Sequence, residues 1–316
     1  STPKPSSAAS DVYKRQCLWR GLKMETIAFI GIGVMGKSMV KNLAKNGYSL
    51  KIYTRTKQKA EDLINNGQIL WCNSVKECVK DADIVMSMVG YPKDVEEIYF
   101  GTDGIIQNAK KNSYLIDFTT SSPKLAQEIE KEALKYQLIA FDAPVSGGDV
   151  GAKNGTLSIM VGGHKEHFET ILPILKTLGT NITYTGTAGF GQHTKMANQI
   201  ALTGAIAGVC EAMSYAKNTG LDVETMLKCV SNGAAGSWQM TNMAPRIIKE
   251  DFEPGFFIKH YIKDMKIALE EANKTDLYLE MSELVLKMYE TLAKEGMDQL
   301  GTQALIKYYQ HSDNNC

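Results

Sequence analysis

A short apolar run that breaks into three spaced glycines constrains this chain more than any other feature. The run TIAFIGIGVMG occupies residues 26–36 and predicts a strand, a tight turn and the start of a helix. In such a turn Gly31 permits the bend, Gly33 lets the backbone approach a pyrophosphate, and Gly36 lets the helix pack closely on the strand. The run therefore favours dinucleotide binding, and the alternative is a structural turn without a ligand. The predicted cofactor contacts here are Gly31, Ile32, Gly33, Val34, Met35 and Gly36.

The end of the next strand indicates which dinucleotide is bound. Residues 49–53 alternate as a strand and end in Thr54, Arg55 and Thr56. An acidic residue at this point would accept the ribose 2′-hydroxyl of NAD, whereas an arginine between two hydroxyls suits the 2′-phosphate of NADP. We therefore predict NADP as the cofactor. NAD remains possible, because arginine and lysine are also common at helix starts where they only face solvent.

Strand-like and helix-like segments alternate as far as Gly186, which is typical of a parallel sheet with helices on both faces. From about Gly191 onward the pattern is helical only, and it predicts one long helix at residues 192–219 and a later helical segment at residues 237–249. Lys195 and Asn198 share one face of the long helix. We expect an α/β protein with a Rossmann doubly wound parallel sheet in residues 24–187 and an all-α second domain in residues 188–316. Residues 1–23 are rich in Ser and Pro without periodicity, and we interpret them as a disordered or non-native extension.

Ligands of open α/β sheets bind at the carboxyl ends of the strands, and three such ends carry candidate residues. Met88 and Val89 end one apolar strand, and Thr120 follows another in a polar turn; we expect all three to contact the cofactor. The third strand end leads into Ser146, Gly147 and Gly148. A hydroxyl followed by two glycines can form a nest of backbone amides that holds a carboxylate. A glycine-rich hairpin without a ligand is the alternative.

Bulk properties restrict the partners of the chain. Thirty-five basic side chains balance thirty-five acidic ones, so no overall charge favours nucleic acid or an anionic membrane. No apolar run is long enough to span a bilayer. The six cysteines lack the spacing of a metal site or a disulfide framework, so we expect no metal and a cytoplasmic protein.

Four motifs in order resemble the β-hydroxyacid dehydrogenase family. They are the glycine run at residues 31–36, DAPVSGG at 142–148, GFGQHTKMAN at 189–198, and the pair Lys263 and Asp264. The family contains 3-hydroxyisobutyrate dehydrogenases, tartronate semialdehyde reductases and glyoxylate/succinic semialdehyde reductases. The resemblance implies a Rossmann domain followed by a helical domain that forms a homodimer or homotetramer. It also implies hydride transfer between NADP(H) and a small β-hydroxy acid or its semialdehyde.

The same resemblance assigns roles to individual residues. Lys195 would be the catalytic acid/base and Asn198 would orient the substrate. The substrate carboxylate would bind at Ser146, Gly147 and Gly148, with Phe256 lining the pocket, and Lys263 and Asp264 would close over nicotinamide and substrate.

One residue departs from the family pattern, and two other functions stay open. The family often has a second asparagine after the lysine, where this chain has Gln199. The alternatives are an inactive NADP-binding interaction module, which would lack Lys195, and an imine reductase, which shares the fold and the glycine loop. The motifs do not identify the acid.

Overall fold

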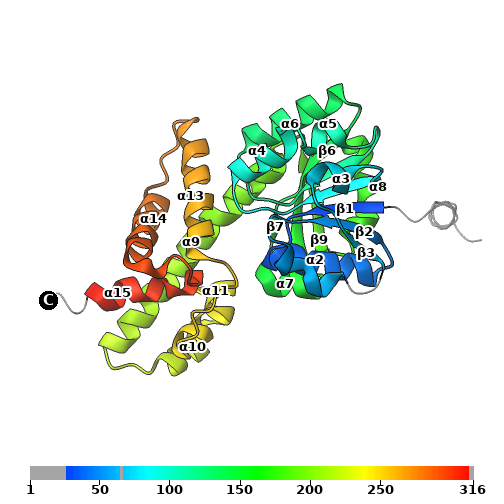
Figure 1. Ribbon diagram of the computed structural model, residues 1–316. Coiled ribbons are helices and arrows are strands. Elements are labelled where there is room, and N and C mark those ends of the chain that lie inside the picture. The colour runs from blue at the N-terminus through cyan, green and yellow to red at the C-terminus, as the bar shows by residue number, and fades with distance from the viewer. Residues whose placement is uncertain (1–25, 65–66, 313–316) are drawn as a thin grey trace, which may run out of the picture.

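The computed structural model describes residues 26–64 and 67–312, so the expectations for residues 1–23 lie outside it. Two lobes are joined by one long helix, α9 (Phe190–Asn218), which starts against the sheet and runs into the helical lobe (Figure 1). The sequence predicted this helix at residues 192–219. Its ends therefore lie within two residues of the prediction.

The first lobe is built on one mixed sheet with the strand order β3-β2-β1-β4-β5-β6-β8-β7, and β9 pairs with β8. The strands are β1 (Thr26–Ile30), β2 (Ser49–Tyr53), β3 (Ile69–Trp71), β4 (Ile84–Ser87), β5 (Tyr114–Asp117), β6 (Ile139–Asp142), β7 (Val145–Ser146), β8 (Leu157–Gly163) and β9 (Gly179–Gly186). The pairs among β1 to β6 are parallel, which confirms the predicted Rossmann sheet.

At one edge of this sheet the strand direction reverses, because β8 runs antiparallel to β6 and to β7. Only the short helix α7 (Gly148–Asn154) and its flanking residues separate β7 from β8. A parallel crossover needs about a dozen residues or more, and this connection is shorter. The segment around Ser146 is consequently held at the end of the parallel sheet.

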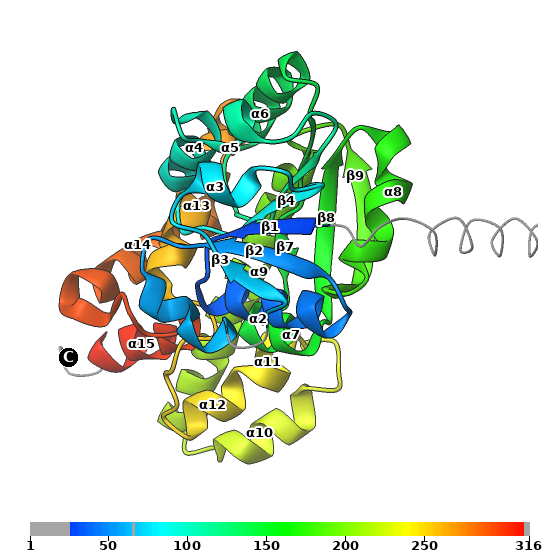
Figure 2. The ribbon, with the colours of Figure 1, turned by 45° about the vertical axis from the view of Figure 1, so that its right-hand side comes forward.

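Helices cover both faces of the sheet (Figure 2). On one face lie α2 (Val34–Lys45), η1 (Lys57–Leu63), α7 and α8 (Lys165–Leu175), with Leu43 and Ile174 in the core beneath them. On the other lie α3 (Val75–Val79), α4 (Pro92–Phe100), α5 (Ile105–Asn108) and α6 (Pro123–Lys135), with Val95 and Ile129 in that core. Apolar strands buried on both faces are typical of a doubly wound fold.

The second lobe packs short helices around α9. They are α10 (Val223–Val230), α11 (Trp238–Asn242), α12 (Ala244–Ile248), α13 (Ile258–Asn273), α14 (Glu280–Leu292), η2 (Ala293–Met297), η3 (Thr302–Leu305) and α15 (Ile306–Ser312). The sequence predicted one helical segment at residues 237–249. The structure has two, because Pro245 lacks the N–H that would continue α11 and instead lies in the first turn of α12.

Aromatic side chains from α13 and α14 form the centre of the second lobe. Tyr261 and Tyr289 are fully buried with ring centroids 4.8 Å apart. Beyond Gly186 the described chain forms no strand, only a single bridge between Phe257 and Gly301. Within the described part of the chain, no helix is both long enough and apolar enough to cross a bilayer.

Candidate active site

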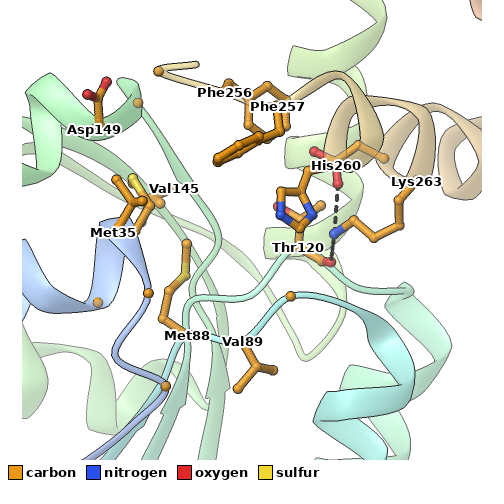
Figure 3. Close-up of a pocket in the computed structure, with 18 of the residues that line it drawn as sticks. Met35, Met88, Val89, Thr120, Val145, Asp149, Phe256, Phe257, His260 and Lys263 are labelled. Atoms are coloured by element: carbon orange, nitrogen blue, oxygen red, sulfur yellow. Dashed lines mark hydrogen bonds and ion pairs between the residues drawn. The ribbon is translucent and has the colours of Figure 1, made fainter. Parts of the chain in front are cut away.

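A cleft of about 1690 Å³ runs between the two lobes. It is lined by every residue that the sequence assigned to cofactor or substrate. Figure 3 shows Met35, Met88 and Val145 of the first lobe across the cleft from Phe257, His260 and Lys263 of the second. The fold therefore brings together residues that are far apart in the sequence.

The three glycines of the first motif occupy the positions that a dinucleotide loop requires. Gly31 has a φ of +98°, and a Cβ there would overlap the carbonyl oxygen of Met88. A Cβ on Gly36 would overlap the carbonyl oxygen of Gly31, so only glycine lets α2 approach β1 this closely. A Cβ on Gly33 would meet no atom within 4 Å. Gly33 thus leaves open space at the cleft.

The start of α2 is suited to an anion. Gly33 is its N-cap residue and has no side chain to bond the first amides of the helix. Val34 and Met35 lie at the cleft, whereas the side chain of Ile32 is buried. Free amides and the helix dipole both favour a phosphate group at this point. The residues present therefore fit the pyrophosphate of NAD(P).

The part of the cleft that follows β2 contains an ion pair that was not among the sequence predictions. Thr54, Arg55 and Thr56 follow β2 and line the cleft. Arg55 Nη1 lies 3.0 Å from Asp94 Oδ1, with the Arg55 side chain 71% exposed and that of Asp94 15% exposed. Asp94 also accepts a hydrogen bond from the Tyr91 amide at 3.1 Å, in the first turn of α4. In the sequence, the position of Asp94 two residues after Pro92 indicates only a helix-capping role. Its contact with Arg55 is therefore visible only in the structure.

At the middle of the cleft Lys263 connects the two lobes. Its Nζ donates to the Thr120 carbonyl oxygen at 2.6 Å and lies 2.8 Å from Asp264 Oδ1 (Figure 3). Thr119, next to Thr120, accepts a hydrogen bond from the Val89 amide at 3.0 Å. Met88, Val89 and Thr120 therefore lie together, as expected for strand ends at one edge of a parallel sheet.

The segment Ser146, Gly147 and Gly148 joins β7 to α7 beside Lys195. Gly147 and Gly148 have φ values of +124° and +62°, which L-residues with side chains adopt at a cost in energy. The ammonium of Lys195 donates to the carbonyl oxygen of Val145 at 2.9 Å. The ammonium of Lys195 therefore lies next to the segment that the sequence predicted as a carboxylate site.

Lys195 is buried in the first turns of α9, with 7% of the residue exposed. Burial lowers the pKa of its ammonium to about 8; Asp264 opposes the shift, and the positive charge of Lys263 adds to it. A lysine with a pKa near neutrality can both donate and accept a proton. The pKa is therefore compatible with the predicted role of Lys195 as general acid/base.

Gln199 links Asn198 to the second lobe. Its Nε2 donates to Asp264 Oδ2 at 2.7 Å, and its Oε1 accepts from Asn198 Nδ2 at 2.8 Å. The Gln199 amide thus presents its Nε2 to Asp264 and its Oε1 to Asn198, which orients the Asn198 side chain. The added methylene of Gln199 is used to reach Asp264.

The cleft wall on the second lobe is aromatic. Phe256 and Phe257 precede α13, and His260 lies on its first turn (Figure 3). The His260 ring contacts Tyr91 of the first lobe at a centroid distance of 5.3 Å. Burial, together with Lys263 and Lys259, lowers the pKa of His260. His260 was not among the predicted site residues, because nothing near it in the sequence marks it as facing α4.

Comparison with known proteins gives two family matches. Residues 26–186 match the NAD binding domain of 6-phosphogluconate dehydrogenase. Residues 189–309 match a family described as NAD-binding of NADP-dependent 3-hydroxyisobutyrate dehydrogenase.

Individual relatives agree with these matches. An uncharacterized oxidoreductase of Bacillus subtilis is 53% identical over 90% of this chain and 99% of its own. A probable 3-hydroxyisobutyrate dehydrogenase-like protein of Arabidopsis thaliana is 39% identical over 91% of this chain and 86% of its own. The structure of a Mycobacterium tuberculosis 3-hydroxyisobutyrate dehydrogenase with L-serine is similar with a TM-score of 0.82, at 27% identity over 90% of this chain and 99% of that one. The chain therefore belongs to the β-hydroxyacid dehydrogenase family and is an NAD(P)-dependent oxidoreductase of the 3-hydroxyisobutyrate dehydrogenase type.

Proposed function

We propose that this protein transfers a hydride between NADP(H) and a small β-hydroxy acid or its semialdehyde, with Lys195 as general acid/base. The observation that carries the proposal is the buried Lys195 ammonium, 2.9 Å from the carbonyl oxygen of the residue before Ser146. 3-Hydroxyisobutyrate and L-serine, named for the relatives, both carry a hydroxyl β to a carboxylate. Lys195 and the family membership favour this reaction over an imine reductase or an inactive module.

Each proposed step uses a residue already placed in the cleft. Amides around Gly147 and Gly148, with the Ser146 hydroxyl, hold the substrate carboxylate. When bound, NADPH supplies the hydride that the carbonyl carbon accepts. The carbonyl oxygen takes a proton from the Lys195 ammonium, which is then reprotonated from solvent. In the oxidation direction neutral Lys195 removes the hydroxyl proton. Asn198, held by Gln199, orients the substrate oxygen.

A panel of small substrates tests the proposal directly. Purified protein is mixed with NADPH and one aldehyde at a time: glyoxylate, semialdehydes of three- and four-carbon acids, and matched aldehydes without a carboxylate. We expect loss of NADPH absorbance with the carboxylate-bearing aldehydes only. Equal rates with the uncharged aldehydes would contradict the carboxylate site, and no turnover with any member would contradict the reaction.

The two directions should depend on pH in opposite ways. Reduction needs the Lys195 ammonium, so its kcat/KM should fall about tenfold per pH unit above the pKa of about 8. Oxidation needs the neutral amine, so its kcat/KM should fall as pH drops below the same value. Initial rates in both directions across this range provide the measurement. If both profiles stay flat through pH 8, another group transfers the proton.

Replacing Gly148 with alanine should raise the KM for the carboxylate substrate by roughly tenfold. A Cβ there would have only the Gly255 carbonyl oxygen, 3.8 Å away, within 4 Å, so the methyl would project into the cleft where the carboxylate binds. Loss of one hydrogen bond to a charged group costs about 1.5–3 kcal/mol. Steady-state kinetics with NADPH saturating provides the measurement.

Gly47→Ala is the matched control for this variant. Gly47 also has a positive φ, +89°, but a Cβ there meets no atom within 4 Å, and the residue does not line the cleft. The Gly47→Ala variant therefore introduces the same kind of backbone strain but places no methyl group in the cleft. An equal rise in KM in Gly148→Ala and Gly47→Ala would show that backbone strain, and not a blocked carboxylate site, causes the change.

The domain limits, assembly and compartment are also proposals. We place the domain limits at residues 24–187 and 188–316, which the sheet's end at Gly186 supports. We expect a homodimer or homotetramer formed through the second lobe, which exposes Tyr278, Met281 and Leu284 in and beside α14. A cytoplasmic location is supported by the described cysteines, Cys72, Cys78, Cys210 and Cys229, which are free thiols.

A further inference from the structure

Gln192 connects two parts of the active site through its side-chain amide. It lies in the first turn of α9 and is fully buried. Its Oε1 accepts from the Ser121 amide at 3.0 Å, and its Nε2 donates to the Thr119 carbonyl oxygen at 2.8 Å. One amide therefore holds the backbone on both sides of Thr120.

The loop that Gln192 holds forms the cofactor side of the cleft. Thr120 lines the cleft, and its carbonyl oxygen receives the Lys263 ammonium. Besides Gln192, the loop is held by the Val89 amide, which donates to the Thr119 hydroxyl. That contact ties the loop to the end of β4, within the same lobe. The two bonds from Gln192 tie the loop to α9 instead.

The start of α9, from which Gln192 reaches the loop, is also held in place by hydrogen bonds. Asp142, at the end of β6, accepts the amides of Gly189 and Gln192, each at 2.8 Å. Burial raises the pKa of Asp142 to about 6, so at neutral pH the carboxylate is ionised and accepts both bonds. Lys195 follows Gln192 by three positions and lies on the same face of the helix. One rigid helical turn thus separates the loop contact from the acid/base.

We propose that Gln192 is a positioning residue, which fixes the Thr120 loop, and with it the nicotinamide side of the cleft, relative to Lys195. This inference rests on the proposed function, because it concerns the distance between hydride donor and proton donor. A displacement of about 1 Å between reacting groups can lower a rate about a hundredfold. The alternative is that the amide only satisfies two buried backbone groups.

The Gln192→Glu variant separates these two roles, because its shape is the same and its hydrogen bonding depends on pH. A protonated carboxyl has one donor and one acceptor and can make both bonds. The ionised form keeps the bond from Ser121 but repels the Thr119 carbonyl oxygen. Burial raises the pKa of a carboxyl at this position, so the protonated form is populated in mild acid. The variant should therefore position the loop correctly only in acid.

The measured quantity is the ratio of kcat in the Gln192→Glu variant to kcat in the wild type at each pH. We expect a ratio near one in mild acid that falls about tenfold to a hundredfold in mild alkali, with little change in KM. The charged groups around this position are Asp142, which accepts the Gln192 amide, Asp117, which accepts the Thr119 amide, and Lys263, whose ammonium donates to the Thr120 carbonyl oxygen. Lys195 lies one turn further along α9, Asp264 pairs with Lys263, and the charge of Glu130 on α6 acts on Asp142. The new carboxyl couples to these groups and shifts their pKa values, so the uncharged Gln192→Met variant below separates loop positioning from this coupling.

Gln68→Glu is the matched control. The Gln68 amide likewise bridges backbone, donating to the carbonyl oxygens of Ala44 and Tyr48 at 2.7 and 2.9 Å, but outside the cleft. Its ratio should stay flat with pH. A flat ratio near one for Gln192→Glu, or the same pH-dependent fall in Gln68→Glu, would overturn the positioning role. So would a loss that appears only in KM.

A second variant gives a readout that needs neither cofactor nor turnover. Gln192→Met removes the acceptor of the Ser121 amide, so hydrogen exchange at Ser121 in the free enzyme should become at least about tenfold faster. If Gln192→Glu does not fold, a lower kcat with unchanged KM in Gln192→Met replaces it as the test of positioning, because faster exchange alone would also follow from a purely structural role. Unchanged exchange would show that Gln192 does not hold the loop. A wild type inactive on the whole substrate panel would refute the proposed function alone, since the exchange at Ser121 tests the contact independently.

Discussion

The Lys195→Ala variant is expected to lose roughly 10²–10⁴-fold in kcat, the range typical of a lost general acid. Reduction of the carbonyl builds negative charge on oxygen, and alanine has no proton to neutralise it. NADPH affinity should change little, because the cofactor residues at Gly33 and Arg55 are untouched. Single-turnover reduction of the best panel substrate, with NADPH binding followed by fluorescence, measures both quantities.

Two further substitutions make this result specific to the acid/base role. Lys195→Arg keeps the positive charge but should not restore activity, because guanidinium gives up its proton too reluctantly. Lys217→Ala removes an exposed lysine from the last turn of the same helix and should behave as wild type. Turnover of Lys195→Ala within about tenfold of wild type would remove this lysine from the mechanism and direct attention to Lys263.

Local chemistry is the reason that the sequence predicted the nucleotide-binding part of the fold well. The positive φ of the turn at Gly31 and the close packing of Gly36 on the Gly31 carbonyl oxygen arise within a few positions of the chain, although the distant Met88 carbonyl oxygen also leaves no room for a side chain at Gly31. The same holds for the long helix α9, which continues as far as its residues favour a helix. Such features are visible in a sequence because their causes lie within one or two turns of chain.

Features that depend on distant parts of the chain could not be predicted in this way. β8 pairs antiparallel with both β6 and β7. The apolar pattern of residues 157–163 is equally compatible with a parallel strand, and contacts with distant strands select between the two. The break between α11 and α12 is different, because Pro245 is a local signal that could have been used in the prediction.

The active site shows the same division. The spacing of Lys195 and Asn198 placed both on one face of a predicted helix, and both line the cleft. The partners that set their orientation lie far away in sequence: Gln199 and Asp264 are 65 positions apart, and Ser121 and Gln192 are 71 apart. Gln199 in place of the family's asparagine was uninterpretable without its contact to Asp264.

Arg55→Ala is expected to weaken NADPH binding about tenfold to a hundredfold and to leave NADH binding nearly unchanged. A hydrogen bond between charged groups contributes about 1.5–3 kcal/mol, and about 1.4 kcal/mol corresponds to tenfold in affinity. Against this stands the ion pair with Asp94, which the 2′-phosphate must displace. Because Arg55 is 71% exposed, that pair contributes only about 0–1 kcal/mol. The bond from Arg55 to the 2′-phosphate should therefore be stronger than its ion pair with Asp94. Dissociation constants of NADPH and NADH for the wild type and the variant measure the difference.

The Asp94→Asn variant tests whether the ion pair competes with the cofactor. Asparagine keeps an oxygen that can accept the Tyr91 amide, so α4 retains its first-turn contact. It removes the charge that holds Arg55 and repels phosphate. We expect NADPH to bind a few-fold more tightly, NADH to change little, and the gain to shrink when Arg55 is alanine, since the part of it that acts through Arg55 is then lost. A wild type that prefers NADH would contradict the predicted role of Arg55 in selecting NADP. An Arg55→Ala variant that loses both cofactors equally would show that Arg55 contacts a part of the dinucleotide common to both.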